Sequence, residues 1–362
     1  MPASLPVLVV EDDVWARLVG VVLDPTTSEE RFAAFADFMT PDLPDFRGWC
    51  DQVRAAAGPL FPSDVRLVGS AAELRDNLAA AQAIVTESLP IGEAELALAP
   101  RLRAVHKYGM IFRNIDAAAC AARGIKVLGT RRRANVQCAE HAFALMLMLA
   151  RRAAELNRLI SVEQLAGRGG PYRPFDRRHT PNANWGRFSG LRPLHGSTIG
   201  IIGLGEIGRE IASRAAAFGM TVLYFQRSRL SQADEANLKA NYRPLESLLT
   251  ESDWIVPQLP LDASTRHLLN RERLALIKQG ACIVNVCRAE IIERSALLDA
   301  LRAGRLGGFA LDVQYEEPGR PDDELLSFDN VVLMPHMAGS PRVNGLQDIE
   351  DVIAGLARAL AA

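Results

Sequence analysis

The sequence predicts an α/β protein with two domains, each built on a parallel β-sheet covered by helices. The chain has 362 residues, a length that favours two domains over one. Short apolar, β-branched segments alternate with helix-like segments along most of it, which is the pattern of repeated βα units. One strand-to-helix junction, at residues 198–212, carries three closely spaced glycines, as nucleotide-binding sheets do.

The composition is that of an ordinary globular chain and argues against several classes of protein. Apolar residues make up 49% of the sequence, charged residues 23%, and the formal net charge is −2, so nothing indicates nucleic acid or an anionic membrane as a partner. The start of the chain lacks the pattern of a signal peptide, and the longest apolar run, Ala142–Ala150, is too short to span a bilayer. Five cysteines without a C-x-x-C pair, and histidines without metal-ligand spacing, predict reduced thiols, a cytoplasmic location and no metal.

The first part of the chain predicts one α/β unit. Leu5–Val10 has the pattern of a strand, residues 11–62 are mixed, and Glu29–Phe38 within them has a helical pattern. A regular βα alternation then predicts four more strands. These are Val65–Val68, Ala83–Val85, Leu102–His106 and Ile125–Leu128.

A long helix and an irregular segment come next. Ala139–Leu159 is apolar on almost all sides in its first half, which favours a helix buried between domains or subunits over an ordinary core helix. Gly167–Pro193 is too long and irregular for a tight connection, so we expect it to wrap a neighbour or to be partly mobile.

The second βα series predicts six strands in a doubly wound sheet. The strands are Thr198–Ile202, Thr221–Phe225, Trp254–Gln258, Cys282–Asn285, Phe309–Leu311 and Val331–Met334. The helices between them include Leu245–Leu249, Arg273–Ile277 and Arg294–Ala303. Val343–Ala362 predicts a final amphipathic helix that returns to the first domain. We therefore expect a domain of residues 1–130 and 338–362, interrupted by a domain of residues 131–337.

The glycine-rich junction predicts a dinucleotide cradle. Gly203 permits a tight turn, Gly205 lets the backbone approach a pyrophosphate, and Gly208 lets the next helix pack close to the strand. We expect Glu206 and Ile207 to contact the cofactor too, and the pyrophosphate would lie on N–H groups at the positive end of the helix. The alternative is an ordinary tight connection, but the preceding strand and the following helix are the context that nucleotide binding requires.

The residues after the next strand bear on which dinucleotide is bound. An acidic residue about 20 positions past the glycines would accept a hydrogen bond from the ribose hydroxyl of NAD. Here that place holds Gln226, followed by Arg227, Ser228 and Arg229. A neutral side chain beside arginines suits a 2′-phosphate, which predicts NADP as the preferred cofactor, with NAD possible. A solvated arginine pair on a surface turn is the alternative.

Three later stretches carry a resemblance to a known family. They are Asn285-Val-Cys-Arg288, Leu311-Asp-Val-Gln-Tyr-Glu-Glu-Pro318 and Met334-Pro-His-Met-Ala-Gly339. In this order after the glycines, they resemble the D-isomer-specific 2-hydroxyacid dehydrogenases, which include phosphoglycerate, glycerate, D-lactate and hydroxypyruvate/glyoxylate enzymes. The resemblance runs from about residue 102 to residue 339. It implies two Rossmann-like or flavodoxin-like domains, with the cofactor domain inserted into a discontinuous substrate domain.

The resemblance implies an active site of Arg288, Glu317 and His336. Arg288 would hold the substrate carboxylate through two parallel hydrogen bonds and polarise the 2-oxo group. His336 would exchange a proton with the substrate oxygen as hydride moves, and Glu317 would orient the imidazole and stabilise its charged form. Taken separately, these are an ordinary surface charge, a loop carboxylate and a satisfied histidine, so their joint occurrence carries the prediction. Glu317 also argues against formate oxidation, because formate dehydrogenases of the family have glutamine there.

The resemblance implies further contacts with the cofactor. Asp312 would help to orient the nicotinamide amide, although it could also be a capping carboxylate at a strand end. Pro260 and Cys287 would lie beside the cofactor. We interpret Cys138 and Cys287 as small buried residues, not as nucleophiles.

The stretch around Lys107, Tyr108 and Gly109 resembles the substrate loop, in which backbone N–H groups meet the substrate carboxylate. Ile111 stands where the family often has a second glycine, and Ala289 where it often has glycine, so the shape of the accepted substrate is open. The basic stretch 131–133 borders the cleft in the family and could contact a second anionic group, but a solvated basic turn is the favoured interpretation.

The predicted function is oxidoreduction: hydride moves between NADPH and C2 of a small 2-oxo acid in the cleft between the domains, giving a D-2-hydroxy acid. A homodimer formed through the long helix and the Gly167–Pro193 segment is expected from the resemblance. The rival hypothesis is a dinucleotide-sensing corepressor on the same fold. The chain has no obvious partner-recruiting tail, which favours the enzyme.

Overall fold

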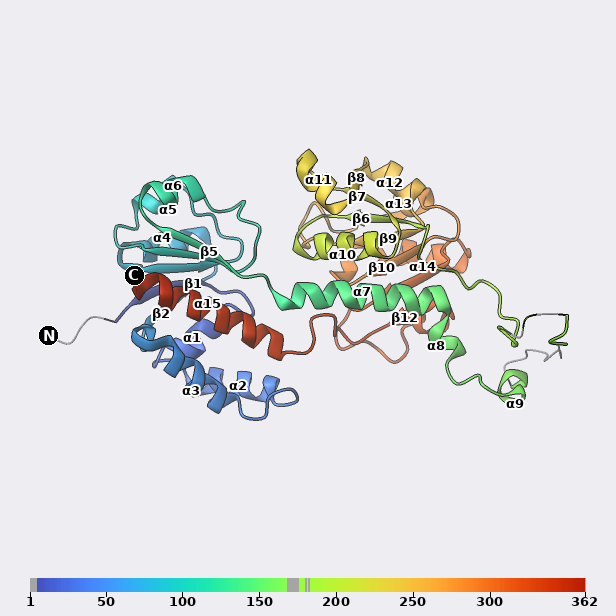
Figure 1. Ribbon diagram of the computed structural model, residues 1–362, viewed down its shortest axis with the longest axis horizontal. Helices are drawn as coiled ribbons and strands as arrows, with labels where there is room; N and C mark the ends of the chain where they lie inside the picture. Colours follow the sequence, from blue (N-terminus) through green and yellow to red (C-terminus); the bar gives the residue numbers. More distant parts are fainter. Residues whose placement is uncertain (1–4, 168–175, 180, 182, 362) are drawn as a thin grey trace. The chain divides into compact units, whose positions relative to one another are not determined.

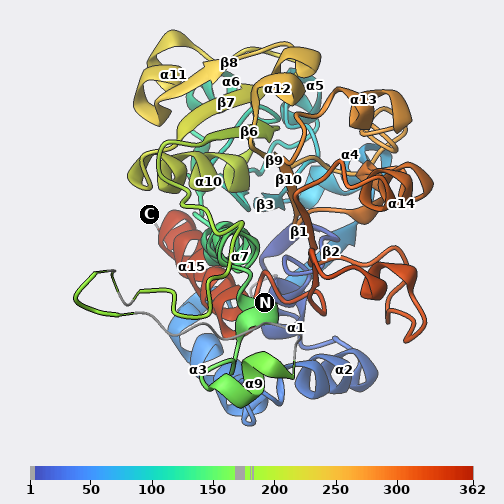
Figure 2. The same ribbon diagram turned by 90° about the vertical axis from the view of Figure 1, so that its right-hand side faces the viewer.

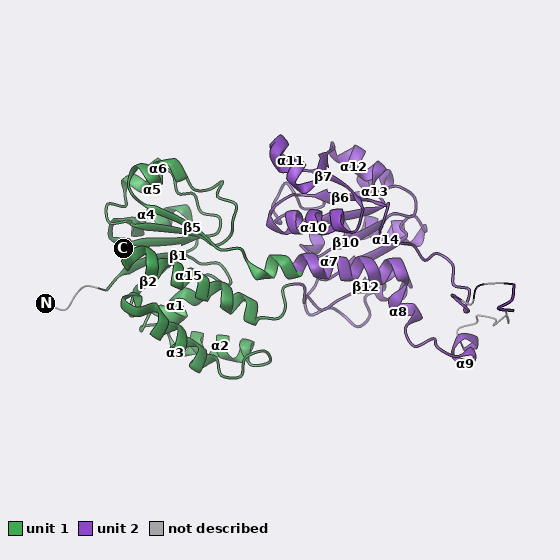
Figure 3. Ribbon diagram, viewed as in Figure 1, with its two compact units in different colours: residues 1–137, 339–362 green, residues 138–338 purple. Residues whose placement is uncertain are grey.

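A computed structural model describes residues 5–167, 176–179, 181 and 183–361 of the chain. It contains two compact units, which Figure 3 colours separately. Unit 1 comprises Met1–Gln137 and Gly339–Ala362, and unit 2 comprises Cys138–Ala338. Each has one parallel sheet covered by helices, so the predicted α/β class is confirmed. Within the irregular segment predicted at Gly167–Pro193, residues 168–175, 180 and 182 lie outside the described residues.

Unit 1 is built on a five-stranded parallel sheet in the order β2-β1-β3-β4-β5. The strands are β1 Val7–Glu11, β2 Asp64–Val68, β3 Ala83–Thr86, β4 Ala104–Lys107 and β5 Lys126–Gly129. Every residue of β3 and β4 is buried, as expected of strands covered on both faces. The order is that of flavodoxin-like sheets, and each strand lies within two residues of its predicted place.

Helices cover both faces of this sheet (Figure 1). They are α1 Leu18–Leu23, α2 Glu29–Met39, α3 Phe46–Ala57, α4 Ala71–Asn77, α5 Glu93–Ala97, α6 Ala117–Ala122 and α15 Val343–Ala361, with short 3-10 turns at Gly58–Leu60 and Leu78–Ala80. One core joins α1, α3 and α15 to the sheet, and a second joins α4, α5 and α6 to the other face. The helix predicted at Glu29–Phe38 is α2, while α1 and α3 in the same stretch were not predicted. Helix α1 is short, apolar and buried throughout, so it shows no amphipathic period.

The C-terminal helix is tied to unit 1 by a buried carboxylate. Asp348 is fully buried, and it accepts hydrogen bonds from the backbone N–H of Arg133 at 3.0 Å and from Nη1 of Arg133 at 2.8 Å. The same Nη1 lies 2.8 Å from a carboxylate oxygen of Asp351, whose side chain is 54% exposed. The interpretation of residues 131–133 as a solvated turn was therefore wrong at Arg133, because the acidic partners come from a helix more than 200 residues away in sequence.

Unit 2 is built on a seven-stranded parallel sheet in the order β12-β11-β10-β9-β6-β7-β8. The strands are β6 Thr198–Ile202, β7 Thr221–Phe225, β8 Ala240–Tyr242, β9 Trp254–Pro257, β10 Cys282–Asn285, β11 Gly308–Leu311 and β12 Val331–Leu333. The prediction of six strands missed β8, a three-residue edge strand without an apolar run of its own. The strand order reverses between β6 and β9, where doubly wound sheets bind their ligands.

Two layers of helices cover the sheet of unit 2 (Figure 2). The helices of this unit are α8 Ala153–Leu156, α9 Val162–Ala166, α10 Glu206–Ala217, α11 Gln232–Leu238, α12 Leu245–Glu251, α13 Arg271–Leu276 and α14 Arg294–Arg302, with 3-10 turns at Ala289–Ile291 and Glu324–Ser327. The long helix α7, Arg133–Arg151, packs with α10 against one face, and α12 to α14 pack against the other.

The predicted bounds of the long helix, Ala139–Leu159, were wrong at both ends. Helix α7 starts at Arg133 and ends at Arg151, because Arg152 takes a left-handed backbone conformation with φ of 49° before α8 begins. The border between the two units falls within α7. No helix among the described residues is long and apolar enough to cross a membrane.

Asp348 and Asp351 both pair with Arg133 but differ in burial, so their replacement should affect stability unequally. Asp348→Ala should lower the free energy of unfolding by about 2–4 kcal/mol, because it removes the fully buried acceptor of two hydrogen bonds from the partly buried Arg133. Asp351→Ala removes a half-exposed partner of the same guanidinium and should cost about 1 kcal/mol or less. Urea unfolding of the two variants measures the difference, and equal losses would contradict a structural role for Asp348.

Candidate active site

The carboxyl ends of three neighbouring strands, β10, β11 and β12, form one edge of the unit 2 sheet. Their register pairs Asn285 with Leu311, and Leu311 with Leu333. Because the strands are parallel, the residues that follow them emerge at this same edge. Asp312, directly after β11, and His336, three residues after β12, therefore belong to one local structure.

Asp312 connects these strand ends. Its carboxylate is fully buried and accepts hydrogen bonds from the backbone N–H groups of Met337 and Ala338, each at 2.9 Å. Its backbone carbonyl accepts the N–H of His336 at 2.7 Å. His141 of α7 brings Nε2 to within 3.2 Å of the same carboxylate. The path of the chain through residues 336–338 is thus set by one aspartate.

The electrostatic state of Asp312 follows from these contacts. Burial alone would raise the pKa of this carboxyl, but the interactions with His141, Met337 and Ala338 outweigh it and hold the pKa below its ordinary value. A buried charge is tolerated when its hydrogen bonds are complete. Asp312 is therefore an ionised carboxylate at neutral pH.

Glu317 and His336 are in direct contact. Nδ1 of His336 lies 2.9 Å from Oε2 of Glu317, while Oε1 of Glu317 accepts the N–H of Gln314 at 2.9 Å. The side chain of Gln314 donates in turn to the carbonyl of Met334 at 2.8 Å. Burial would raise the pKa of Glu317, but the hydrogen bonds from His336 and Gln314 hold it below its ordinary value. Because an ionised carboxylate can only accept, Nδ1 carries a proton and Nε2 is the ring nitrogen left for another partner.

Arg288 emerges at the same edge, in a loop organised by Asn285. The buried side chain of Asn285 accepts the N–H of Cys287 at 2.9 Å and donates to the carbonyl of Arg288 at 2.9 Å. The exposed Arg288 donates from Nη1 to the carbonyl of Cys287 at 2.6 Å. Burial raises the pKa of the Cys287 thiol, which suits a small buried residue and not a nucleophile.

The glycines after β6 have the geometry that a dinucleotide cradle needs. Gly203 has φ of 105°, and a Cβ there would lie 2.4 Å from the carbonyl oxygen of Gln258. A Cβ on Gly208 would lie 2.2 Å from the carbonyl oxygen of Gly203, so α10 can approach the turn only with glycine at that place. A Cβ on Gly205 would meet nothing within 4 Å, which leaves the backbone open to a ligand. The residues present fit a pyrophosphate at the N-terminus of α10.

The loop after β7 lies beside this cradle. Gln226 accepts the N–H of Leu204 at 3.3 Å and donates to the carbonyl of Ser228 at 2.5 Å, so it links the glycine turn to the arginine loop. Arg227 is exposed and makes no ion pair or side-chain hydrogen bond with another described residue.

Arg229 has its own acidic partner. Its Nε and Nη2 donate to Glu235 of α11 at 2.8 and 2.9 Å, and Tyr224 donates to the same carboxylate at 2.7 Å. These hydrogen bonds from Arg229 and Tyr224 lower the pKa of Glu235 to about 2. Of the two arginines that the sequence singled out, Arg227 alone is unpaired among the described residues.

In unit 2, the exposed Pro260 lies in the segment after β9, where its carbonyl accepts the hydroxyl of Thr265 at 2.7 Å. Glu206 and Ile207 form the first turn of α10.

The predicted substrate loop lies in unit 1, at the carboxyl end of β4. Lys107 is 6% exposed and donates from Nζ to the carbonyl of Glu87, and Tyr108 is 1% exposed. The guanidinium of Arg132 lies 5.2 Å from the centre of the Tyr108 ring. Within this unit, Tyr108 can therefore offer a ligand little more than its backbone. Gly109 follows with φ of 146°.

Several residues that shape these loops were not singled out from the sequence. Asn285 and Gln314 were read only as parts of longer motifs, although a polar side chain at the end of an apolar strand was a usable signal. His141 begins the long apolar run of α7, where a lone histidine needs a polar partner. Glu11 ends β1 and accepts three backbone N–H groups of residues 87–89, a contact across 76 residues or more that no local pattern indicates.

Taken together, the doubly wound sheet, the glycine cradle and the polar edge of β10 to β12 define a dinucleotide-dependent oxidoreductase. No group of three or more His, Cys, Asp or Glu side chains among the described residues could hold a metal ion.

Comparisons with known proteins identify the family. The family model for the D-isomer specific 2-hydroxyacid dehydrogenase NAD binding domain matches residues 143–338. Glyoxylate reductases from Pyrococcus furiosus and Thermococcus kodakarensis are 40% and 39% identical over 256 residues, which cover 71% of this chain and 72% of each relative. The chain belongs to the D-isomer-specific 2-hydroxyacid dehydrogenase family, and it is an NAD(P)-dependent oxidoreductase that interconverts 2-oxo and 2-hydroxy acids.

Solved structures of other proteins support this assignment. A glyoxylate reductase from Paecilomyes thermophila matches with a TM-score of 0.54 and 26% identity, covering 99% of this chain and 95% of that one. D-mandelate dehydrogenase of Rhodotorula graminis matches with a TM-score of 0.57, covering 97% of this chain and 92% of that one, but at 22% identity it supports the fold alone. The named relatives favour the enzyme over the corepressor hypothesis.

The buried charge of Asp312 predicts a stability that depends on pH. Because its pKa is lowered in the folded protein, the stabilisation is present above the ordinary value of about 4 and is lost as pH falls through the folded value. Wild type should therefore be more stable than Asp312→Asn near neutral pH, and the gap should narrow in acid. Urea unfolding at several pH values measures it.

Asp329→Asn is the matched control, since it removes the same charge from an exposed side chain. It should leave the free energy of unfolding within about 0.5 kcal/mol of wild type. A gap between wild type and Asp312→Asn that widens in acid would contradict the assignment of an ionised Asp312.

Proposed function

We propose that the protein reduces glyoxylate and other short 2-oxo acids to D-2-hydroxy acids with NADPH, and that His336 delivers the proton. The observation that carries this proposal is the contact of 2.9 Å between Nδ1 of His336 and the carboxylate of Glu317, at the sheet edge that also presents Arg288. The glyoxylate reductase names of the relatives support the choice of a small acid.

When bound, the reduced nicotinamide would supply a hydride to C2 of the substrate. His336, whose Nδ1 is held by Glu317, presents Nε2 to the substrate oxygen and gives it a proton. Glu317 keeps the ring oriented and stabilises the positive charge that the ring carries before transfer. Arg288 holds the substrate carboxylate through its planar guanidinium. Asp312 positions His336 through the backbone.

In this proposal, unit 2 binds the cofactor and unit 1 contributes to substrate binding. Unit 2 holds the cofactor through Gly203, Gly205 and the N-terminus of α10. Unit 1 would present the backbone around Gly109 to the substrate carboxylate. The low exposure of Tyr108 supports a backbone contact over a side-chain contact, and Lys107 would fix the loop by holding the carbonyl of Glu87.

We also propose that NADP is preferred over NAD, with Arg227 as the main contact of the 2′-phosphate. Gln226 carries no charge that would repel a phosphate, and Arg227 is exposed and unpaired among the described residues. Arg229 supports the loop through Glu235 and contributes less, because its charge is already matched.

A homodimer and a cytoplasmic location complete the proposal. Leu147 of α7 and Ile160 are 39% and 83% exposed, and apolar side chains of this kind favour a partner surface. Sedimentation equilibrium would show a monomer if this is wrong. The five cysteines are free, which suits a reducing compartment, and cell fractionation would reveal any other location.

Replacing the proton donor should abolish turnover without removing the cofactor. His336 has φ of 52°, a conformation that asparagine tolerates better than alanine, so His336→Asn is the cleaner variant. We expect kcat with glyoxylate to fall about 10²- to 10⁴-fold, while the Kd for NADPH changes little. Loss of reduced nicotinamide absorbance measures the rate.

The exposed His179 provides the matched control, since His179→Ala should keep wild-type rates. The same assay with a panel of 2-oxo acids tests the function itself. No turnover of any acid by wild type, with cofactor binding intact, would overturn the proposed activity.

Cofactor choice should depend on Arg227 more than on Arg229. Arg227→Gln should lower the ratio of kcat/KM for NADPH to that for NADH by about 10- to 100-fold, the effect of a lost charge-assisted hydrogen bond. Arg229→Gln removes the same charge from a paired residue and should change the ratio less. A wild-type preference for NADH would refute the NADP proposal.

A further inference from the structure

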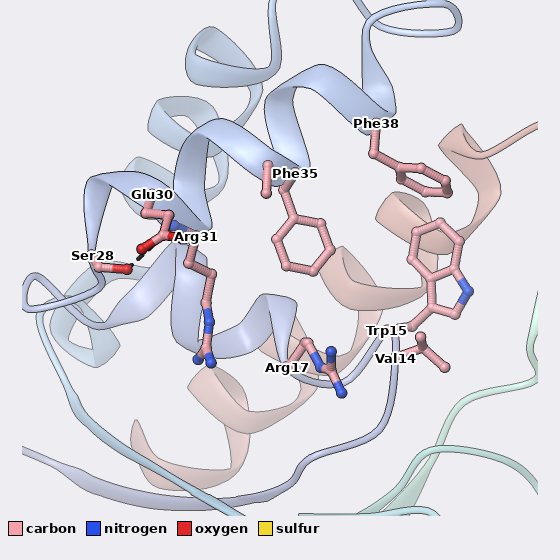
Figure 4. A pocket seen from close by; sticks show the side chains of 9 residues that line it. Val14, Trp15, Arg17, Ser28, Glu30, Arg31, Phe35 and Phe38 are labelled. Atoms are coloured by element: carbon pink, nitrogen blue, oxygen red, sulfur yellow. Dashed lines mark hydrogen bonds between the residues drawn. The ribbon is translucent and has the colours of Figure 1, made fainter.

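A cavity of about 600 Å³ lies in unit 1, between the segment that follows β1 and helix α2 (Figure 4). Its wall is made by residues from Val14 to Arg17 and from Ser28 to Phe38. The proposed chemistry uses none of these residues. The volume is within the range of about 300–1,000 Å³ of small-molecule sites, so the cavity is large enough to hold a small ligand.

One end of the cavity is aromatic. Trp15, Phe35 and Phe38 line it, and the rings of Trp15 and Phe38 are 6.2 Å apart at an angle of 59°. Phe38 is 48% exposed and Val14 is 67% exposed. Trp15 and Phe35 are half-buried. Aromatic rings grouped in this way around one hollow are typical of ligand sites.

The rings of Trp15 and Phe38 are each packed against another part of unit 1. The Trp15 ring packs against Gly345 of α15, where an added Cβ would lie 2.3 Å from the ring. The guanidinium of Arg342 lies 4.8 Å from the centre of the Phe38 ring and is itself bonded to Asp42 at 3.0 Å. A ligand would therefore meet rings that are already ordered, which lowers the entropic cost of binding.

The other end of the cavity is basic. Figure 4 shows the guanidinium groups of Arg17 and Arg31 on the same side of the hollow, below the ring of Phe35. Nε of Arg17 is 3.0 Å from Asp12, so this arginine is oriented by a partner. Arg31 is exposed, and its side chain makes no ion pair or hydrogen bond with another described residue. Glu30 also lines the cavity, and its charge disfavours a dianion.

From this arrangement we propose that the cavity binds a small amphipathic monocarboxylate, an acid with an aromatic or branched apolar body. Its carboxylate is held by Arg31, with Arg17 beside it, because guanidinium groups bind carboxylates with two parallel hydrogen bonds. Its apolar body lies against Phe35 and Trp15. Because Arg17 is already paired with Asp12, the charge that favours an acid over a neutral or cationic ligand is that of Arg31.

The experiment is calorimetric titration of the whole enzyme with phenylpropionate, which has no 2-oxo or 2-hydroxy group to react, and with phenylpropionamide, its neutral counterpart. We expect the acid to bind and the amide to bind at least about 10-fold more weakly, the effect of one charge-assisted hydrogen bond. Arg31→Gln should weaken binding of the acid about 10-fold, and Phe35→Leu should weaken it by several fold.

Arg101→Gln is the matched control, because it removes an exposed positive charge from unit 1 outside the cavity wall. It should leave the affinity unchanged, and thermal melting checks that all variants are folded. Equal affinity for acid and amide, equal effects of Arg31→Gln and Arg101→Gln, or no heat at millimolar acid would each overturn the proposal. So would self-association that Phe38→Ser abolishes, since a second copy of the chain would then fill the hollow.

Discussion

A buried carboxylate, Asp312, organises the carboxyl edge of the unit 2 sheet. It receives two backbone N–H groups from the segment after β12 and a close contact from His141 of α7. Such a charge is stable in an interior only when its hydrogen bonds are complete, so the three chain segments around it can adopt few other arrangements. The contact between Glu317 and His336 depends on this restraint, because the backbone of His336 is itself bonded to Asp312. The backbone of the proposed proton donor, His336, is therefore fixed by Asp312.

The loop after β7 carries two arginines whose charges are not equally available. Arg227 and Arg229 lie within four residues after the end of β7. Glu235 of α11 pairs with Arg229, and no described residue pairs with Arg227. The proposed selectivity for a 2′-phosphate thus depends on which guanidinium is left unmatched, not on the number of arginines. The aromatic and basic cavity on α2 follows the same physical rule, since Arg17 is matched by Asp12 while Arg31 is available to a ligand.

Much of the fold was predictable because apolar period and glycine placement are local signals. Three strands, Thr198–Ile202, Thr221–Phe225 and Cys282–Asn285, have the predicted bounds, since buried parallel strands are continuous apolar runs. Strand β8 and helix α1 were missed because one is a short edge strand and the other is apolar throughout, and neither shows a period. The end of α7 was misplaced because a left-handed residue, Arg152, interrupts an otherwise helical sequence.

The sequence by itself determined the α/β class and the strand–glycine–helix junction, because these follow from local residue patterns. The choice of Arg288, Glu317 and His336 came from the resemblance of three motifs, in their order, to one family. Only the tertiary structure decided which charges meet. It paired Arg133 with Asp348, Arg229 with Glu235 and Glu11 with the loop after β3. It also buried Tyr108 and left Arg227 and Arg31 open. Partners of this kind come from segments brought together by packing, and the strength of a charge interaction depends on burial and distance, which no local pattern of residues contains.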